Sequence, residues 1–521
     1  MKNRSGQIII LWLFLLPSMN QVVNAQNQEY ITGKIINSAT SSPVPFATIK
    51  LKNNNLGVYA NAEGDFRISR NTDFAIDSVI ITCIGYKRFS LAYSDFNETE
   101  ANRILLTPIV YGLHEVKVEA SRRIPGPLAV IRKAIRYIYK NFPDKPYNYI
   151  AYYRDYQKKD STYLNLNEAI VQTFDGGFGT SSFFNLYRLL DFRQNNEFPR
   201  IEISPYYDVY KEDQINSPYK VIPKAMMGDQ YGNELFILLV HDALRNYNKR
   251  SFSFVEKLSE DFIGNHVFAN PVTVLNNNLV LYKISFTAKK FVTGDSLSVA
   301  GAIYIQPRDY SIHKLEYTAY YKNKNKTLKP AYNIDIEYGY ENSADSKMCL
   351  RYISFNNIFK VTDPMDENYF RVLSSGWDTL HKAKTTIDIN FNHEIDPKSA
   401  SKKDNYVITL GKKTLKIQGI QVVGRKLFIR LRDEDILGKK EACRINIYNL
   451  KDTRGKIIDQ RKTVELYQYR ELFVQDYNKT LPYSDSCFIM MQPLNQNCIS
   501  KVDGTLNYWM NTPENITNRK K

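Results

Sequence analysis

The sequence predicts a mainly β protein that is divided into several domains. Apolar and polar residues alternate in many short segments separated by Gly, Asn and Pro, which is the pattern of antiparallel strands. The chain contains 38 Tyr and 27 Phe residues, and aromatic side chains favour strands over a helical bundle. Its length of 521 residues also exceeds the usual size of one domain, so we expect several folded units.

The first 25 residues have the features of an export signal. Lys2 and Arg4 give a positive start, and residues 8–16 are a run of nine apolar residues. Small residues up to Ala25 allow cleavage before Gln26. A spanning helix needs roughly 20 apolar residues, so this run is too short, and no later segment approaches that length. We therefore expect an exported protein in the periplasm, at the cell surface or peripherally associated with the outer membrane.

Residues 31–68 contain the most specific motif of the chain. The order is G-x-I, then P-V-P-F-A-T-I, then L-G-x-Y-A-N-x-E-G-D-F, and residues 79–86 continue as V-I-I-T-C-I-G-Y. This arrangement resembles the carboxypeptidase regulatory-like module, a prealbumin-like β-sandwich found at the front of outer-membrane and secreted proteins of the Bacteroidetes. The resemblance covers residues 29–118 and implies a non-catalytic accessory domain there.

Residues 122–370 are expected to form a central α+β domain with an antiparallel sheet and two helices. Pro127 suits the first turn of one helix, which ends at Pro143. Residues 234–247 carry apolar side chains at helical spacing. The remaining strands predict a meander of about six strands, one face of which the helices cover. Residues 301–316 look similar to a hairpin of periplasmic lipoprotein-carrier folds, and the whole segment resembles the central region of Bacteroidetes envelope proteins.

Residues 376–468 predict a third unit of short alternating strands. The order I-x-F-N-x-x-I-D-P-x-S, V-x-G-x-x-L-x-I-x-L and I-x-x-L-K-D-x-x-G-K resembles a bacterial immunoglobulin-like module of surface-layer type. The resemblance implies a C-terminal Ig-like β-sandwich that serves as a spacer or an adhesive module. Residues 469–521 are then expected to be a C-terminal tail with a disordered polar end.

The charge is basic but dispersed. Lys and Arg number 70 against 54 Asp and Glu, which gives a net charge of +16. No run of five basic residues is present, so nucleic acid is not an expected partner. An anionic lipopolysaccharide, an acidic glycan or another envelope protein is a better partner for an exported chain, although the charge also suits a generally basic, soluble surface.

The five cysteines are too scattered for a disulfide framework. Cys83, Cys349 and Cys443 lie in strand-like runs, where Cys behaves as a small apolar residue. Only Cys487 and Cys498 are close in sequence; an oxidising compartment permits a bridge between them but does not require it. No His accompanies them, so no zinc site is expected there.

The one candidate for metal chemistry is His313-Lys314-Leu315-Glu316, which has the His-x-x-Glu spacing of metallocarboxypeptidases. In a strand, side chains three positions apart point to opposite faces, so His313 and Glu316 are not expected to share a metal ion. A third ligand such as His393 would have to come from another sandwich. Residues 175–179, rich in Gly, lack the lysine of a phosphate-binding loop.

Carboxylates beside tyrosines also suit carbohydrate. Asp155, Asn167 and Glu168 lie on Tyr-rich strands, where they would line a groove or else face solvent and basic side chains. We expect no catalytic, cofactor-binding or metal-binding residue, and a non-enzymatic envelope protein with a binding or structural role. The alternatives are an accessory of outer-membrane transport that carries a hydrophobic or glycan ligand, and a hydrolase acting on glycan or peptide.

Overall fold

The computed structural model describes residues 30–512 apart from a set of gaps. The gaps are 54–55, 62, 71–73, 110–123, 161, 195–197, 201–233, 246–256, 277–278, 296, 323–327, 341–346, 363–365, 367, 378–384, 433–442, 478–486, 489–493, 495–497 and 501–507. The expected export signal, residues 1–25, therefore lies outside the described residues. The chain divides into two compact units: one is Met1–Val110 with Trp509–Pro513, and the other contains Tyr111–Tyr508. Both are built mainly from strands, which confirms the predicted fold class.

The smaller unit contains two sheets. A three-stranded sheet has the order β4-β1-β7, and a four-stranded sheet has the order β3-β2-β5-β6. The strands are β1 (Tyr30–Asn37), β2 (Thr48–Leu51), β3 (Gly57–Tyr59), β4 (Asp65–Ser69), β5 (Ser78–Thr82), β6 (Phe89–Ala92) and β7 (Asn102–Leu106). Every second residue of most of these strands is buried, including Ile35, Ile49, Phe66, Ile81 and Ile104, because alternate side chains of a strand point to one face.

The sequence motif of this unit has local structural causes. A Cβ atom on Gly33 would lie 2.4 Å from the ring of Phe66, so only glycine lets β1 and β4 pair at this point. The turn before β4 is closed by Asn61, whose Oδ1 accepts hydrogen bonds from the backbone N–H groups of Glu63 (3.0 Å) and Asp65 (2.8 Å). The A-N-x-E-G-D motif thus marks the tight turn by which the chain passes from β3 in one sheet to β4 in the other.

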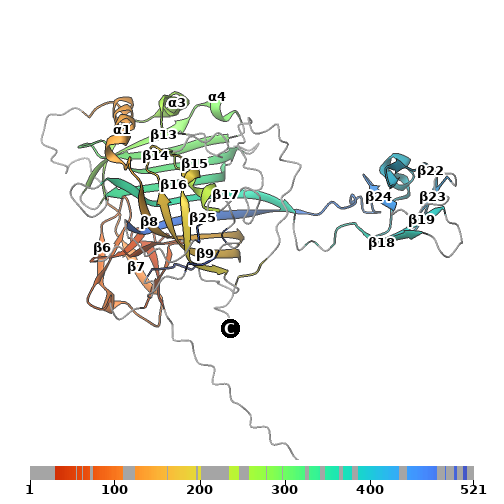
Figure 1. The fold of residues 1–521 in the computed structure, drawn as a ribbon, viewed down its shortest axis with the longest axis horizontal. Helices are drawn as coiled ribbons and strands as arrows, with labels where there is room; N and C mark the ends of the chain where they lie inside the picture. Colours follow the sequence, from red (N-terminus) through yellow and green to blue (C-terminus); the bar gives the residue numbers. More distant parts are fainter. Residues whose placement is uncertain are drawn as a thin grey trace, which may run out of the picture. The chain divides into compact units, whose positions relative to one another are not determined.

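The larger unit is built on an 11-stranded sheet (Figure 1). Its order is β10-β9-β8-β25-β17-β16-β15-β14-β13-β11, with β12 also paired to β13, and neighbouring strands are antiparallel. The strands are β8 (Tyr147–Lys159), β9 (Thr162–Asp175), β10 (Leu186–Gln194), β11 (His266–Phe268), β12 (Val272–Asn276), β13 (Leu279–Ala288), β14 (Leu297–Ile305), β15 (Ile312–Lys322), β16 (Leu328–Tyr340), β17 (Met348–Thr362) and β25 (Thr463–Tyr477). The predicted meander of about six strands was therefore too small.

The tail expected from residue 469 is wrong for its first part. Strand β25 lies inside the sheet, where Leu472 pairs with Tyr153 of β8 on one side and with Ile353 of β17 on the other. Further along, Cys487 and Cys498 form a disulfide with their Cα atoms 5.8 Å apart. Burial of β25 on both faces hides the simple alternation that marks a strand in sequence.

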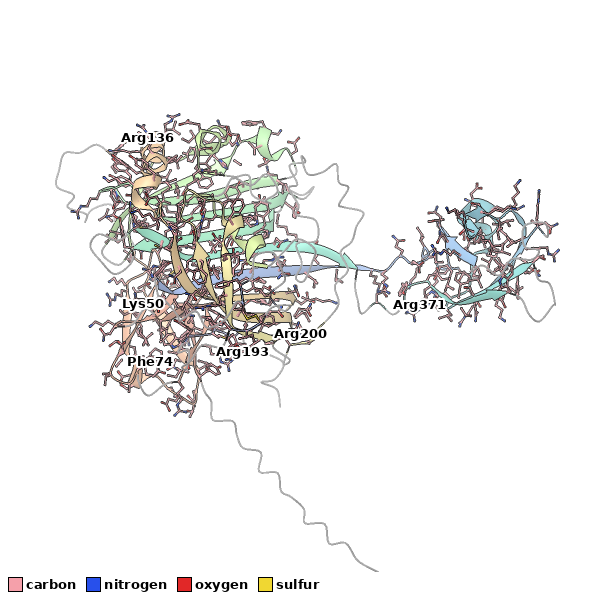
Figure 2. The ribbon with its side chains drawn as sticks, in the orientation of Figure 1. Lys50, Phe74, Arg136, Arg193, Arg200 and Arg371 are labelled. Atoms are coloured by element: carbon pink, nitrogen blue, oxygen red, sulfur yellow. A yellow bond between two sulfur atoms is a disulfide. The ribbon has the colours of Figure 1, made fainter. Side chains whose placement is uncertain are left out.

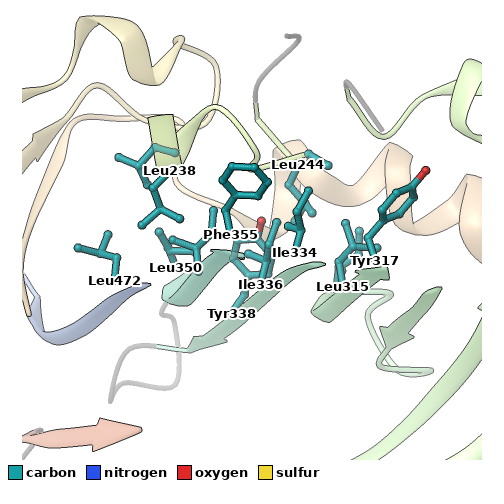
Figure 3. Close-up of a cluster of buried hydrophobic side chains, with 14 of the residues drawn as sticks. Leu238, Leu244, Leu315, Tyr317, Ile334, Ile336, Tyr338, Leu350, Phe355 and Leu472 are labelled. Atoms are coloured by element: carbon teal, nitrogen blue, oxygen red, sulfur yellow. The ribbon is translucent and has the colours of Figure 1, made fainter. Parts of the chain in front are cut away.

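The helices that pack on the central sheet share one apolar core with it. Those in the described residues are α1 (Pro127–Asn141), α2 (Glu234–Leu239), α3 (Glu260–Asn265) and α4 (Lys290–Thr293), two more than predicted. Figure 3 shows Leu238 and Leu244 on one side of this core, and Leu350, Ile334 and Ile336 of the sheet on the other. The apolar face of the sheet is thus used for packing against the helices.

Helix α1 begins at Pro127 and ends before Pro143, as predicted. The second predicted helix, residues 234–247, is shorter, because α2 ends at Leu239. Polar contacts replace the missing turns: the Asp242 carboxylate accepts hydrogen bonds from the backbone N–H of Leu244 (3.1 Å) and from the Tyr338 hydroxyl. These buried contacts compete with the helical ladder and end it.

The residues between β17 and β25 form a module with its own core. Its sheets have the orders β18-β19-β23-β22 and β21-β20-β24. The strands are β18 (Val372–Trp377), β19 (Thr386–Phe391), β20 (Tyr406–Leu410), β21 (Lys413–Thr414), β22 (Ile417–Val423), β23 (Lys426–Leu431) and β24 (Cys443–Ile447). Because Thr362 pairs with Thr463, this inserted module interrupts a hairpin of the central sheet instead of following it. The predicted limit at residue 468 falls inside β25.

Candidate ligand-binding face

The His-x-x-Glu pair lies on β15, but its two side chains have different neighbours. His313 Nε2 lies 3.1 Å from Ser311 Oγ, and burial lowers the pKa of His313 to about 4. Glu316 forms an ion pair with Lys314 (3.2 Å) and accepts a hydrogen bond from the Tyr304 hydroxyl (3.0 Å). In the described part of the chain, no three His, Cys, Asp or Glu side chains are grouped so that they could hold a metal ion.

His393, the third ligand considered, lies in the inserted module. Its Nδ1 is 2.9 Å from Asp452 Oδ2, and its Nε2 is 3.1 Å from Asn368 Oδ1. Both ring nitrogens are thus engaged within that module. The structure does not bring His393 into the set of neighbours that surrounds His313 or Glu316.

The Tyr-rich strands do not form an open groove at the predicted residues. Asp155 accepts hydrogen bonds from the Tyr153 hydroxyl (2.8 Å) and from Asn167 (3.3 Å), and Glu168 accepts one from the Tyr152 hydroxyl. The exposed fractions of Asp155, Asn167 and Glu168 are 0%, 1% and 2%. These side chains are hydrogen-bonded inside the protein and do not face solvent. Asn167 also accepts a hydrogen bond from Arg200 (3.0 Å), which is the pairing with a basic side chain that the sequence allowed.

A row of polar residues, most of them acidic, runs across the central sheet at directly paired positions of neighbouring strands. Adjacent strands pair Glu316, Asp335, Ser354, Glu471, Arg154 and Glu168 in that order. Arg154 and Glu471 form an ion pair, and burial raises the pKa of Asp335 to about 6. Because Ser354, Glu471 and Arg154 are 0% exposed, this row joins the strands and leaves little room for a ligand.

The Gly-rich loop, residues 175–179, is part of a structural clamp. The Asp175 carboxylate accepts the backbone N–H of Gly177 (2.8 Å) and forms a buried ion pair with Arg245. Arg245 also donates to the carbonyl oxygen of Gly177 (3.0 Å). The loop therefore anchors the segment that follows α2, and its carboxylate is already neutralised.

An open polar face lies on the inserted module. Along β23, Leu427 and Ile429 enter the module core, so Lys426, Phe428 and Arg430 point away from it. The neighbouring strands β19 and β22 add polar residues opposite these positions. We define the β23 face as Asp388, Asn390, Gln421, Lys426, Phe428 and Arg430.

Several observations show that the β23 face is accessible. Lys426 and Arg430 are exposed, and Phe428 is half-buried. On the two edge strands, a Cβ atom added to Gly376 or Gly419 would meet no atom within 4 Å. Among the residues that the structure describes, the side chains of Lys426 and Arg430 have no ion-pair partner. These cations are therefore available to a ligand.

The inserted module also concentrates the positive charge. Residues 366–462 contain 21 Lys and Arg against 13 Asp and Glu, a difference of +8, which is half of the +16 of the whole chain. The ring of Phe428 offers an apolar surface, while the amides of Asn390 and Gln421 offer donors and acceptors. An aromatic ring with amides and exposed cations suits a saccharide that carries phosphate or carboxylate groups.

Sequence reasoning identified the β23 strand but missed its outer face. The motif V-x-G-x-x-L-x-I-x-L places Phe428 and Arg430 at its variable positions, so the outward alternation was visible in the sequence. The sequence did not show that this face is open, because its openness depends on small residues of the strands β18 and β22.

No helix among the described residues is both long and apolar enough to cross a membrane. No curated protein matches the chain. The N-terminal part of the bacterial S-layer protein SbsC is similar at 24% identity over 19% of this chain and 23% of that chain, with a TM-score of 0.16. A Bacteroides fragilis protein described as membrane-associated and of unknown function is 8% identical over 86% of this chain and 98% of that chain, with a TM-score of 0.13. Neither score establishes a shared fold.

One family comparison bears directly on the smaller unit. Residues 31–118 match the family model of the CarboxypepD_reg-like domain. This agrees with the predicted limits of 29–118 and with the two sheets found there. The N-terminal segment of the chain is therefore a carboxypeptidase regulatory-like domain.

Proposed function

We propose that this protein is an exported, non-catalytic protein of the cell envelope that binds an anionic glycan through the β23 face. The observation that carries the proposal is the pair of exposed cations on either side of Phe428, Lys426 and Arg430, for which the described part of the chain offers no ion-pair partner. The accessory nature of the regulatory-like domain and the export signal in residues 1–25 support the non-catalytic envelope role. The inserted module would then be an Ig-like adhesive module.

The chemistry of the ligand follows from the side chains. The Phe428 ring can stack on the C–H face of a pyranose, and Asn390 and Gln421 can exchange hydrogen bonds with its hydroxyls. Arg430 can bind a phosphate or carboxylate through two parallel N–H donors, which Lys426 supplements as a point charge. A phosphorylated saccharide such as the core of lipopolysaccharide satisfies all three requirements.

The carrier alternative has less support. A carrier of a hydrophobic ligand needs apolar space between the helices and the central sheet. Leu238 and Leu244 instead pack directly on the sheet, beside Ile334 and Leu350 (Figure 3). The apolar face that a carrier would offer to its ligand is thus occupied by side chains of the protein itself.

The proposal is tested by binding of the mature full chain to purified lipopolysaccharide. We expect saturable binding that is lost after chemical removal of the phosphates. Binding should also weaken as the salt concentration rises from 50 to 500 mM, because salt screens exposed charges from one another over a length of about 10 Å at 0.1 M. A double variant Lys426→Ala, Arg430→Ala should weaken binding at least tenfold, and Phe428→Ala should weaken it at every salt concentration.

The other sheet of the same module supplies the control. Lys413 of β21 and Arg444 of β24 are also exposed, so Lys413→Ala, Arg444→Ala removes the same charge without touching the β23 face. This variant should bind almost normally. Equal losses in the two double variants would mean that only the general basic charge attracts lipopolysaccharide, and absence of binding would reject the proposal.

A further inference from the structure

The end of the chain enters the core of the carboxypeptidase regulatory-like domain. Trp509, Met510 and Asn511 belong to the same compact unit as residues up to Val110. Their exposed fractions are 0%, 6% and 3%. Tyr508–Thr512 has no regular secondary structure, so Trp509, Met510 and Asn511 are buried without being part of a helix or a sheet.

Two contacts anchor this segment. The indole of Trp509 meets the ring of Phe74 edge-on, with ring centroids 6.0 Å apart, and Phe74 in turn meets Tyr93 at 5.9 Å (Phe74 is labelled in Figure 2). The Asn511 side-chain amide donates a 2.7 Å hydrogen bond to the backbone carbonyl of Tyr59. Tyr59 ends β3, which is an edge strand of the four-stranded sheet.

This combination is typical of peptide recognition. A buried aromatic anchor supplies most of the contact area, and a hydrogen bond to an edge strand fixes the direction of the peptide. Asn511 and Tyr59, which share this hydrogen bond, are 452 positions apart in the chain. The segment is therefore not part of the continuous sequence that forms the rest of the domain. The family model likewise ends at residue 118, without residues 509–511.

The chain just before this segment is held by the other unit. The disulfide Cys487–Cys498 closes one loop there, and the Ser500 backbone N–H donates a 2.8 Å hydrogen bond to the Leu189 carbonyl of β10. Seven residues then separate Ser500 from Tyr508. A short tether of this kind gives a bound segment a millimolar effective concentration, so even a weak site remains filled.

We propose that Phe74, Tyr93 and the end of β3 form a peptide-binding site for the pattern Trp-x-Asn, and that the chain's own Trp509–Asn511 segment is its resident ligand. The site is distinct from the β23 face and does not depend on it. Its ligand class is an extended peptide with an aromatic anchor followed two residues later by a side-chain amide.

The test uses the full chain with a seven-residue viral protease recognition sequence in place of residues 501–507. After cleavage, residues 508–521 should remain with the protein in gel filtration. A fluorescent peptide of the same sequence should exchange into the site with the domain still folded, and the Trp509→Ala peptide should compete at least tenfold less well. In a Trp12→Phe, Trp377→Phe background, Trp509 is the remaining tryptophan, and release of the segment should shift its emission to longer wavelength.

Three results would overturn the proposal. Immediate loss of the cleaved segment would show that the site has no affinity of its own. Exchange only when the domain unfolds would make the segment an integral part of the fold. If the uncleaved protein formed a concentration-dependent dimer in which each copy held the Trp509–Asn511 segment of the other, the site would instead serve dimerisation. Ile76→Ala, at a side chain 97% exposed in the same unit, should leave exchange unchanged.

Discussion

The Arg154 guanidinium and the Glu471 carboxylate form an ion pair that is fully excluded from solvent, although the residues are 317 positions apart. Glu471 also accepts a hydrogen bond from the Tyr352 hydroxyl (3.2 Å). The pair joins β8 to β25, and Tyr352 adds β17 to the same contact. One carboxylate therefore joins three strands, of which β8 and β17 precede the inserted module in the chain and β25 follows it.

Removal of this carboxylate should destabilise the central sheet strongly. Glu471→Ala leaves the Arg154 cation buried without its partner, and such changes cost about 3–5 kcal/mol. We expect faster hydrogen exchange in β8 and β25, which mass spectrometry of their peptides measures. Replacing both partners with apolar residues of similar size should be less damaging than the single change, since no isolated charge then remains.

A surface pair is the matched control. Arg132 and Glu260 are also far apart in sequence and form an ion pair, but their side chains are 45% and 71% exposed. Glu260→Ala should therefore cost less than about 1 kcal/mol. If both glutamate variants exchanged hydrogen equally fast, the Arg154–Glu471 pair would not be the buried link described here.

The sequence predicted the parts of the fold that depend on local patterns. The A-N-x-E-G-D turn and Gly33 identified the first sandwich because their roles depend on contacts within that domain. The sequence did not predict strand β25, because both of its faces are buried and because the charged residues Arg470 and Glu471 interrupt its apolar pattern. Its partners on β8 lie more than 300 residues away, and no local pattern indicates such pairing.

The candidate sites show the same division. The period of a strand alone predicts that His313 and Glu316 point to opposite faces, and the two side chains have different neighbours in the structure. The surroundings of Asp155 and Glu168 depend on which tyrosines lie beside them in the folded sheet. The burial of Trp509 in the first domain could not be predicted at all, because nothing in residues 31–118 indicates that a segment is missing.

Acid should destabilise the larger unit through its buried histidines. Burial lowers the pKa of His241 to about 3 and that of His266 to about 4. The unfolded chain therefore takes up protons below pH 6.5 that the folded chain does not, so stability falls as the pH falls from 6.5 toward 4. For His241 alone the loss between pH 7.5 and pH 5 is about 2 kcal/mol.

The contribution of His241 is isolated by substitution. His241→Gln cannot titrate, so its urea midpoint should fall less between pH 7.5 and pH 5 than that of the wild-type protein. Asp335 acts in the opposite direction, because burial raises its pKa to about 6 and its contribution is lost as the pH rises through that value. An unchanged pH slope in His241→Gln would contradict the assignment of a buried, neutral imidazole.

Export should remove the first 25 residues. The small residues before Ala25 and the apolar run at residues 8–16 predict cleavage before Gln26. Intact-mass and N-terminal peptide analysis of protein from an exporting host should find Gln26, or its cyclised form, at the new end. Replacement of Ala25 by a bulky residue such as Phe should slow this cleavage, whereas a mature protein that keeps Met1 would reject the export signal.

The His-x-x-Glu pattern on β15 should prove structural. His313 contacts Ser311, and Glu316 contacts Lys314 and Tyr304, so the purified mature protein should contain no stoichiometric zinc by elemental analysis. The double variant His313→Ala, Glu316→Ala should lose only about 1–2 kcal/mol of stability, as is usual for substitutions that open no large cavity. His393→Ala, in the inserted module, should behave similarly in both assays. Zinc bound at one ion per chain and lost in the double variant, together with peptide hydrolysis that disappears with it, would overturn the non-catalytic assignment, because it would require His313 and Glu316 to converge on one ion.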